Sequence, residues 1–485
     1  MNAAGQVKTA PEDRIKMWHR LAYGAGAFVN NLLAAASGGM MIVLNLGLGM
    51  NPALVGLLGA LPRLTDAFTD PLMGYISDNS KSRWGRRRPF IFGGVIAAAV
   101  IFAILWQLPE ARSESFYFVW FLVGSILFYM GYTVFATPWV ALGYELTPDY
   151  HERTRLMGTQ NFVGQLAYVV SPWFLWIMNS GKFFPDQVTG AAGLAIIIAI
   201  VAIGLGILPA IFLRERMQAV AAAETEQGKG LKRNLIEFFA GFKETLSNSA
   251  FMKLCVATFL VFNGFILVAS FQFYVIIYYV FGGDQTEGAK YAGWAGTVGA
   301  VCTFAVVAFV TWLSTRIGKR RAFFVATGVS ILGYGLKWIC YNPELPWLVI
   351  VPAPLIAFGL GGLFTLMPSM IADVVDTDEL KTHQRREGMF GSIFWWMVKL
   401  GLSAALAGGG YMLNATGFDV NLGGSQSSST IVLLRIFDAG VPMLTSAIAI
   451  WAVISYPITE ARAREVREEL EQRRGKPGAV DPAAS

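Results

Sequence analysis

Residues 62–90 read PRLTDAFTDPLMGYISDNSKSRWGRRRPF and run from an apolar segment into the most basic cluster of the chain. Asp66 and Asp70 are four residues apart, so both carboxylates project from one face of a helix, with Thr69 beside them. An ionised side chain within a membrane span is costly unless it is paired or coordinates an ion, so the two acids predict a cation site. The basic residues 81–88 place the following turn on the cytoplasmic side.

The composition indicates an all-α, polytopic membrane protein. Of 485 residues, 55% are hydrophobic and only 14% are charged, which excludes an ordinary soluble enzyme. The net charge of +6 arises from Lys and Arg in short loops between apolar runs, where orientation in the membrane explains it, so nucleic acid is not an expected partner.

Apolar runs long enough to cross a bilayer predict about twelve helices at roughly 20 residues per crossing. They begin near residues 21, 52, 90, 116, 157, 191, 251, 291, 322, 347, 389 and 431. Alternate loops are basic, which places both termini in the cytoplasm. These basic loops are residues 81–88, 153–155, 316–321 and 381–386.

An internal repeat predicts two halves. Residues 82–90, SRWGRRRPF, are echoed by residues 315–323, TRIGKRRAF, as expected for parallel repeats of six helices that rock about a central site. The polar stretch between them reads as a linker with an amphipathic helix. The predicted organisation is an N-terminal tail (1–20), a first bundle (21–214), a cytoplasmic linker (215–250), a second bundle (251–456) and a C-terminal tail (457–485).

Three motifs resemble those of the glycoside–pentoside–hexuronide:cation symporters, within the major facilitator superfamily. They are residues 66–89 for helix II and its loop, 138–156 for helix IV, and 372–399 for helix XI with the loop before it. The resemblance implies the major facilitator fold and cation-coupled symport of a sugar or glycoside by a monomer in the cell inner membrane. No cofactor is expected beyond the coupling ion, Na⁺ or H⁺, and the chain is not expected to be an enzyme.

The predicted cation site combines the two acids with hydroxyl groups. Asp66 and Asp70 are its core, Thr69 supports them, and Thr133 matches the family's helix IV hydroxyl. Arg63 lies one turn before Asp66, so a buried ion pair is the alternative explanation for the acids. By resemblance, Lys399 couples the second half to this site.

The predicted substrate residues are uncharged, which favours a neutral solute. At the family's helix I acid this chain has Asn31, and at the helix IV acid it has Ala136, so the resemblance implies sugar contacts that differ from those of the family prototype. A packing role is an equal alternative for each residue taken singly. The set comprises Asn31, Tyr132, Trp139, Asn161, Gln165 and Trp395.

Charged residues at the cytoplasmic ends of helices are predicted to gate transport, with plain orientation or a solvated loop as the alternative. The predicted gating residues are Arg83, Arg87, Arg88, Glu145, Asp149, Glu152, Arg153, Asp373 and Asp376.

Three other functions stay open. Lysolipid transporters of the same superfamily share the paired acids and the helix XI lysine, so a lysolipid or other amphipathic solute is the first alternative. A membrane enzyme would need a catalytic cluster, yet His19, His151 and His383 are scattered and lack metal-ligand spacing. A receptor without transport would leave the intramembrane acids unexplained.

Overall fold

The computed structural model describes residues 14–80, 82–109, 111–147, 150–215, 245–383 and 387–473. Every regular element in these ranges is helical, so the predicted all-α class is confirmed for the described part of the chain. The predicted linker, residues 215–250, lies almost wholly outside these ranges, and with it most of the amphipathic helix.

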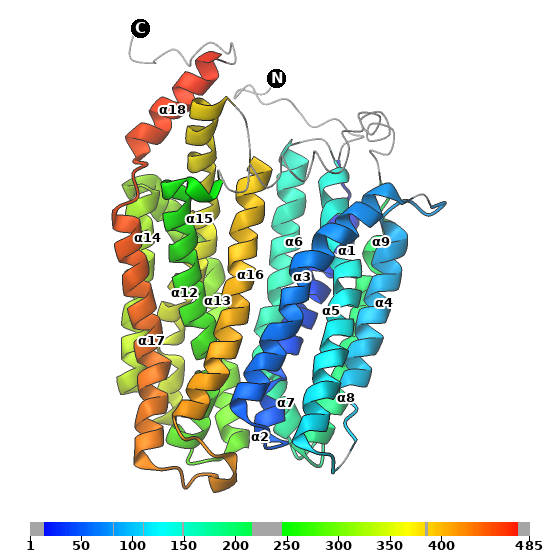
Figure 1. Ribbon diagram of the computed structural model, residues 1–485, viewed down its shortest axis with the longest axis vertical. Helices are drawn as coiled ribbons and strands as arrows, with labels where there is room; N and C mark the ends of the chain where they lie inside the picture. Colours follow the sequence, from blue (N-terminus) through cyan, green and yellow to red (C-terminus); the bar gives the residue numbers. More distant parts are fainter. Residues whose placement is uncertain are drawn as a thin grey trace. The chain divides into compact units, whose positions relative to one another are not determined.

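The helices up to residue 215 follow the predicted runs closely (Figure 1). They are α1 (Met17–Gly39), α2 (Ile42–Leu46), α3 (Pro52–Asn79), α4 (Arg88–Leu105), α5 (Glu114–Glu145), α6 (Tyr150–Val170), η2 (Ser171–Trp173), α7 (Phe174–Asn179), α8 (Gln187–Gly206) and α9 (Leu208–Phe212).

The helices from residue 245 onward include the terminal helix α18, which lies beyond the predicted spans. They are α12 (Ser249–Tyr274), η3 (Val275–Val280), α13 (Gln285–Ile317), α14 (Lys319–Cys340), η4 (Pro346–Ile350), α15 (Ala353–Thr382), α16 (Glu387–Ala415), η5 (Val420–Leu422), α17 (Ser428–Ile454) and α18 (Glu460–Arg473).

Ten of these helical segments are long and apolar enough to cross a membrane, counted over the described residues. The two other predicted crossings exist as helices but carry polar groups. In α3 the apolar stretch covers only Pro52–Thr65 among the described residues, and Arg63, Asp66 and Asp70 are charged positions in or just after it. Helix α6 begins with charged residues and continues through η2 into α7. Both helices therefore carry polar groups that a helix serving only to cross the membrane would not need.

Local sequence fixes where the site-bearing helices begin. The Asn51 side chain accepts a hydrogen bond from the Ala53 N–H at 2.9 Å, and Pro52 occupies the first turn of α3. The Ser113 hydroxyl caps α5 in the same way, accepting from the Phe116 N–H at 3.3 Å. Each helix exceeds 25 residues, so at 1.5 Å per residue it is long enough to span about 30 Å of hydrocarbon.

The chain forms two compact units. Unit 1 contains the described residues up to 215 with Ile276–Ala300 and Leu406–Ile431. Unit 2 contains the described residues from 245 to Val275, then Val301–Ala405 and those from Val432 onward. The bundle boundaries at residues 214 and 251 stay predictions.

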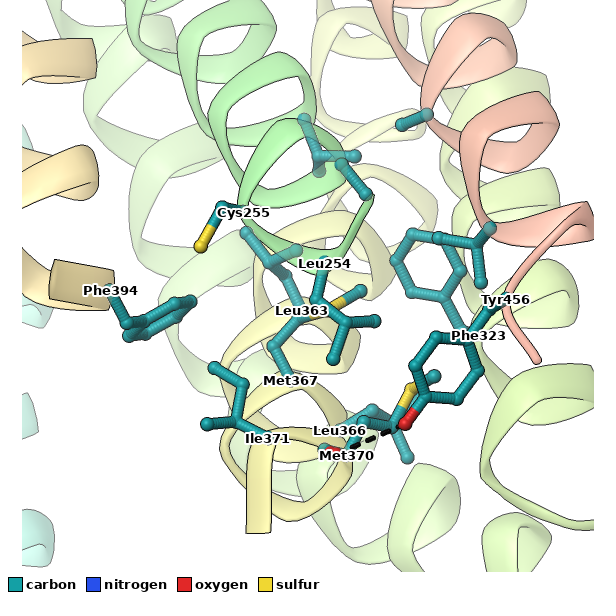
Figure 2. Packing of buried hydrophobic residues seen from close by; sticks show 14 of the residues in the cluster. Leu254, Cys255, Phe323, Leu363, Leu366, Met367, Met370, Ile371, Phe394 and Tyr456 are labelled. Atoms are coloured by element: carbon teal, nitrogen blue, oxygen red, sulfur yellow. Dashed lines mark hydrogen bonds between the residues drawn. The ribbon is translucent and has the colours of Figure 1, made fainter. Parts of the chain in front are cut away.

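Each unit has its own apolar core. In unit 1, rings such as Phe102, Phe128 and Phe135 are fully buried between α4 and α5. In unit 2, α12 packs on α15 through Leu254, Leu363 and further aliphatic side chains (Figure 2).

Helix α18 lies within the predicted C-terminal tail. It packs on α15 and buries Val466 and Leu470. This tail segment is therefore an ordered part of unit 2 and not a solvated extension of α17.

Candidate functional site

The best-defined part of the predicted cation site joins α3 to α5. The Thr133 hydroxyl of α5 donates a hydrogen bond to Asp70 Oδ1 of α3 at 2.9 Å. Thr133 is only 2% exposed, so the contact lies inside the bundle of unit 1. A buried carboxylate gains stability from such a donor.

The other two cation-site residues lie on α3 near Asp70. The Thr69 hydroxyl donates to the Thr65 carbonyl at 3.2 Å, which leaves its oxygen lone pairs available to an ion. The helical backbone puts positions 66 and 70 on one face, one turn apart. The Asp66 side chain lies outside the described part of the chain, so the four-oxygen site stays a prediction.

Arg63 is held by an aromatic ring of α5. Its guanidinium lies 5.0 Å from the centroid of the Tyr129 ring, and the Tyr129 hydroxyl is 2.9 Å from the Ser37 hydroxyl of α1. Arg63 is thus tied to α5 and, through Tyr129, to α1, whereas the predicted pairing with Asp66 is untested. A cation over a ring face contributes about 0.5–2 kcal/mol, more when it is desolvated.

Two predicted substrate residues, Asn31 and Tyr132, are linked through Asn30. The Tyr132 hydroxyl donates to Asn30 Oδ1 at 2.7 Å, and Asn30 Nδ2 donates to Asn31 Oδ1 at 3.3 Å. Asn31 in turn donates to the Gly164 carbonyl of α6 at 3.0 Å. These amides and hydroxyls connect α1, α5 and α6, and they suit exchange of hydrogen bonds with a hydroxyl-rich solute.

The remaining predicted substrate residues of unit 1 differ in exposure. Trp139 is 2% exposed, and its ring nitrogen donates to the Tyr23 carbonyl at 3.2 Å, so its side chain packs between helices in this structure. Asn161 is exposed and Gln165 is half-buried on α6. The packing alternative therefore describes Trp139 here, while substrate contact stays a prediction for all three.

Trp395 and Lys399 lie one turn apart on α16, in unit 2. Trp395 is 54% exposed and stacks against Phe364 of α15, with centroids 6.1 Å apart and planes inclined by 10°. Lys399 is half-buried. The acids of α3 belong to unit 1, so coupling through Lys399 stays a prediction.

A charge cluster at the end of α5 contains two of the predicted gating residues, Glu145 and Arg87. Glu145 Oε1 pairs with Arg86 and lies 3.1 Å from Arg87 Nη2. The carboxylate of Glu215 accepts hydrogen bonds from the backbone N–H groups of Arg86 and Arg87, at 3.0 and 2.8 Å. Glu215 therefore caps the start of α4, where the helix dipole favours a negative charge.

Arg88 and Arg83 behave differently from Arg87. The Arg88 guanidinium donates to the carbonyls of Ala210 and Ile211 at 2.5 and 3.0 Å, which caps the end of α9. Arg83 is exposed. Arg87 and Arg88 thus make contacts of a kind that can break and re-form during transport. The gating role of Arg83, Arg87 and Arg88 stays a prediction.

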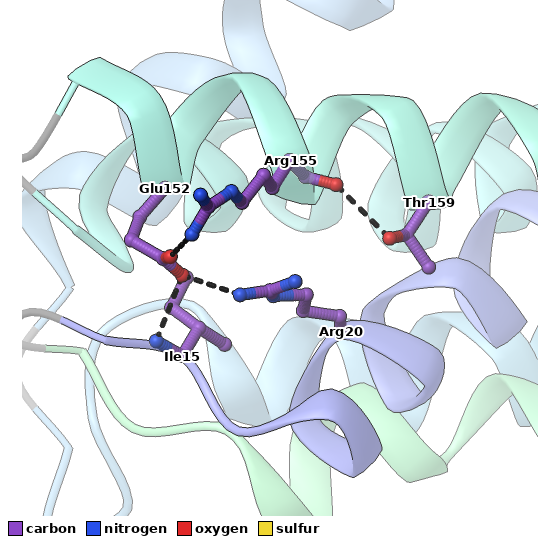
Figure 3. Close-up of polar contacts among 5 residues, drawn as sticks. All are labelled: Ile15, Arg20, Glu152, Arg155 and Thr159. Carbon is purple, nitrogen blue, oxygen red and sulfur yellow. Dashed lines mark hydrogen bonds and ion pairs between the residues drawn. The ribbon is translucent and has the colours of Figure 1, made fainter.

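Glu152 at the start of α6 is completely buried and holds the chain segment before α1. Its carboxylate accepts from Arg20 at 2.6 Å, from Arg155 at 2.7 Å and from the Ile15 N–H at 3.2 Å (Figure 3). The contacts favour a charge lock over a solvated loop for this residue. Asp149 and the Arg153 side chain lie outside the described part of the chain.

Unit 2 repeats the turn that precedes α4. Gly85 and Gly318 both have positive φ, 105° and 82°, a conformation that glycine adopts without strain. Each is followed by a basic residue paired with an acid, and in unit 2 Lys319 lies 2.7 Å from both carboxylate oxygens of Asp373. The two copies of the sequence repeat therefore also share a turn with a glycine of positive φ and a pair between a basic residue and an acid.

Sequence reasoning missed several partners of the predicted residues. Arg20, Arg86 and Glu215 belong to the charge locks, but their partners are more than 50 positions away in the chain. Asp376 is half-buried on α15, one turn beyond Asp373. In the described ranges no group of three His, Cys, Asp or Glu residues could hold a metal ion.

Sequence comparison gives a match along nearly the whole chain. The family model described as MFS/sugar transport protein matches residues 22–460. An uncharacterized symporter of Synechocystis, sll1374, is 26% identical over 95% of this chain and 98% of its own. The glucuronide carrier protein homolog of Escherichia coli is 27% identical over 88% of this chain and 89% of its own. The sodium-dependent lysophosphatidylcholine symporter 1 of Gallus gallus is 23% identical, covering 95% of this chain and 90% of its own.

Structural comparison agrees at the level of the fold. The inward-facing, unoccupied crystal structure of a bacterial homolog to the human lysosomal transporter Spinster superposes with a TM-score of 0.67 and 16% identity. The superposition covers 93% of this chain and 98% of that one.

Proposed function

Because the chain belongs to the MFS/sugar transport protein family, we propose that it is a symporter that moves a neutral sugar or glycoside with Na⁺ or H⁺ by alternating access. The family and the relatives are transporters, so the chain is a multi-pass membrane transporter of the major facilitator fold with a small-molecule substrate, and not an enzyme. The choice of solute and ion is the proposal.

The hydrogen bond from Thr133 to Asp70 carries this proposal. It brings a hydroxyl of α5 to a carboxylate of α3 inside unit 1. An empty, charged carboxylate is costly to carry through a closed state, whereas a carboxylate neutralised by a cation is not. Cation loading can therefore decide which states interconvert, and this is the basis of coupling.

Sodium is our proposed coupling ion. Na⁺ is a hard cation that prefers several oxygen ligands at once, and the carboxylates of Asp66 and Asp70 with the hydroxyls of Thr69 and Thr133 would supply four. A proton would need only one carboxylate oxygen. The oxygen-rich set supports Na⁺, while H⁺ riding on either acid is the alternative outcome of the test.

Alternating access also needs locks that form and break. The Glu145 pairs with Arg86 and Arg87 in unit 1 and the Lys319–Asp373 pair in unit 2 are suited to this task. By the basic-loop rule these locks face the cytoplasm, in an inner membrane with both termini inside. We further propose that one chain is the functional unit.

A lysolipid is the second candidate substrate. The similarity to a lysophosphatidylcholine symporter extends over 95% of the chain, and the uncharged groups around Asn31 do not select for a sugar ring. Binding to the purified protein separates the candidates. A rise in its melting temperature with glycosides, seen only when Na⁺ is present, would support the proposal. A rise with lysolipids and none with glycosides would favour the second candidate.

A further inference from the structure

Unit 2 contains a buried ion pair that none of the predicted sites includes. Lys337 Nζ of α14 lies 2.9 Å from Asp438 Oδ1 of α17, and each side chain is 2% exposed. The rings of Tyr334 and Tyr341 flank the ammonium, with centroids 5.8 and 5.5 Å away. Both residues lie in helices that are long and apolar enough to cross a membrane, and both side chains are buried.

Such a pair is poorly explained by stability alone. Desolvating two charges costs about as much as their attraction returns, and apolar residues of similar volume often stabilise as well. Removing one partner, by contrast, is strongly destabilising because a lone buried charge remains. An ion pair within a membrane span is therefore a candidate for a functional role.

The pair is linked to a third helix close to where that helix changes its geometry. Lys337 Nζ also approaches Gln272 Oε1 of α12, at 3.4 Å. Three residues after Gln272, at Val275, the α-helix becomes the π-helix η3. Val275 itself lines a small pocket with Lys337 and Asp438. The ion pair thus contacts the last α-helical turn of α12.

The neighbours of this helix change at the same point. Up to Val275 the helix belongs to unit 2, and from Ile276 it belongs to unit 1. There Ile277 packs so closely on α13 that a Cβ at Gly288 would lie 2.7 Å from its Cγ1, and Tyr278 packs edge-on against Phe418, with centroids 4.8 Å apart. A π-helical segment interrupts the regular hydrogen-bond ladder, and such segments are frequent at functional sites and helix kinks.

We propose that Lys337 and Asp438 are positioning residues for transport. Together with Gln272 they fix the end of the α-helical part of α12, and the η3 turns form the joint at which the segment from Ile276 moves during the transport cycle. The proposal rests on the transport function proposed above. In this role the pair neither binds the coupling cation nor forms a cytoplasmic gate.

The test uses variants that break the link without leaving a lone charge. Gln272→Leu removes the contact with α12, and the double variant Lys337→Met with Asp438→Leu removes both charges together. Lys337→Arg keeps the positive charge and the hydrogen-bond donors, so it is the charge-preserving variant. Glu287→Leu with Lys290→Met removes an exposed ion pair of α13 and is the matched control.

Two readouts on purified, full-length protein decide the proposal. We expect amide hydrogen exchange in residues 274–281 to be at least tenfold faster in Gln272→Leu and in the double variant, and the maximal transport rate to fall at least fivefold with an unchanged KM. Lys337→Arg and the control should match the wild type. Unchanged exchange would overturn the proposal, and so would faster exchange with a wild-type maximal rate, since the pair would then be structural only. Absence of transport by the wild type would refute the proposed function, whereas the exchange readout would still test the joint.

Discussion

The Thr133 hydroxyl of α5 donates to the Asp70 carboxylate of α3. A substitution that removes this hydroxyl should therefore affect ion binding first. Thr133→Ala removes the donor to Asp70 and a proposed Na⁺ ligand. We expect the Na⁺ concentration for half-maximal uptake to rise about tenfold, equivalent to about 1.4 kcal/mol, with a smaller change in the maximal rate. Uptake measured over a range of Na⁺ concentrations checks this.

The matched control for Thr133 lies one turn further along α5. Thr137→Ala deletes the same atoms from a residue whose methyl group faces Gly74 and which has no place in the proposed site. It should leave the Na⁺ dependence unchanged. Equal effects of both substitutions would attribute the loss to helix packing instead of ion coordination.

The sequence was informative about Asp70 because it belongs to a long motif with fixed spacing, and about Thr133 because it matches the helix IV hydroxyl of the family. It was uninformative about Lys337 and Asp438, although each is a charged residue within an apolar run. Their partnership spans 101 positions, and only the packing of α14 on α17 brings them together. The burial of Trp139 was equally hidden, because the spacing of one helix does not reveal which face its neighbours cover.

At the scale of helices, Glu152 connects α6 to the start of α1. Glu152→Ala leaves the Arg20 guanidinium and the Ile15 N–H without their buried acceptor. We expect the free energy of unfolding to fall by about 3 kcal/mol, as for other broken buried pairs. Thermal unfolding in detergent, followed by intrinsic fluorescence, measures the loss.

An exposed ion pair provides the comparison for Glu152. Glu287→Ala breaks the pair with Lys290 on α13, where both side chains are more than 40% exposed. Surface pairs contribute about 0–1 kcal/mol, so the melting temperature should barely change. If Glu152→Ala were as mild, its network would be a surface feature and not a lock.

Some elements could be predicted from the sequence and others could not. The start of α3 near residue 52 followed from the apolar run, and the repeated turn followed from the echo of residues 82–90 in residues 315–323. The π-helix η3 has the sequence VIIYYV, which is indistinguishable from any other apolar segment, so its geometry depends on neighbouring helices. The folding of residues 460–473 as α18 on α15 was likewise not foreseen.

At the scale of the whole molecule, loop charge predicts the orientation in the membrane. Single cysteines at Ser80 and Ser427, in a background without the three native cysteines, should differ in labelling by an impermeant maleimide added to intact cells. We expect Ser80→Cys to be shielded and Ser427→Cys to react, because loop charge predicts that the basic turn at residues 81–88 faces the cytoplasm. The reverse pattern would invert the proposed topology.

Accumulation of solute in proteoliposomes under a cation gradient tests the central claim most directly. An inward Na⁺ gradient at equal pH should concentrate a glycoside in vesicles with the wild-type protein, and Asp70→Asn should abolish accumulation while the protein stays folded. Equal accumulation driven by a pH gradient without Na⁺ would instead make the protein a proton symporter. Accumulation by Asp70→Asn at the wild-type level would contradict the account, because the carboxylate of α3 would then have no part in coupling.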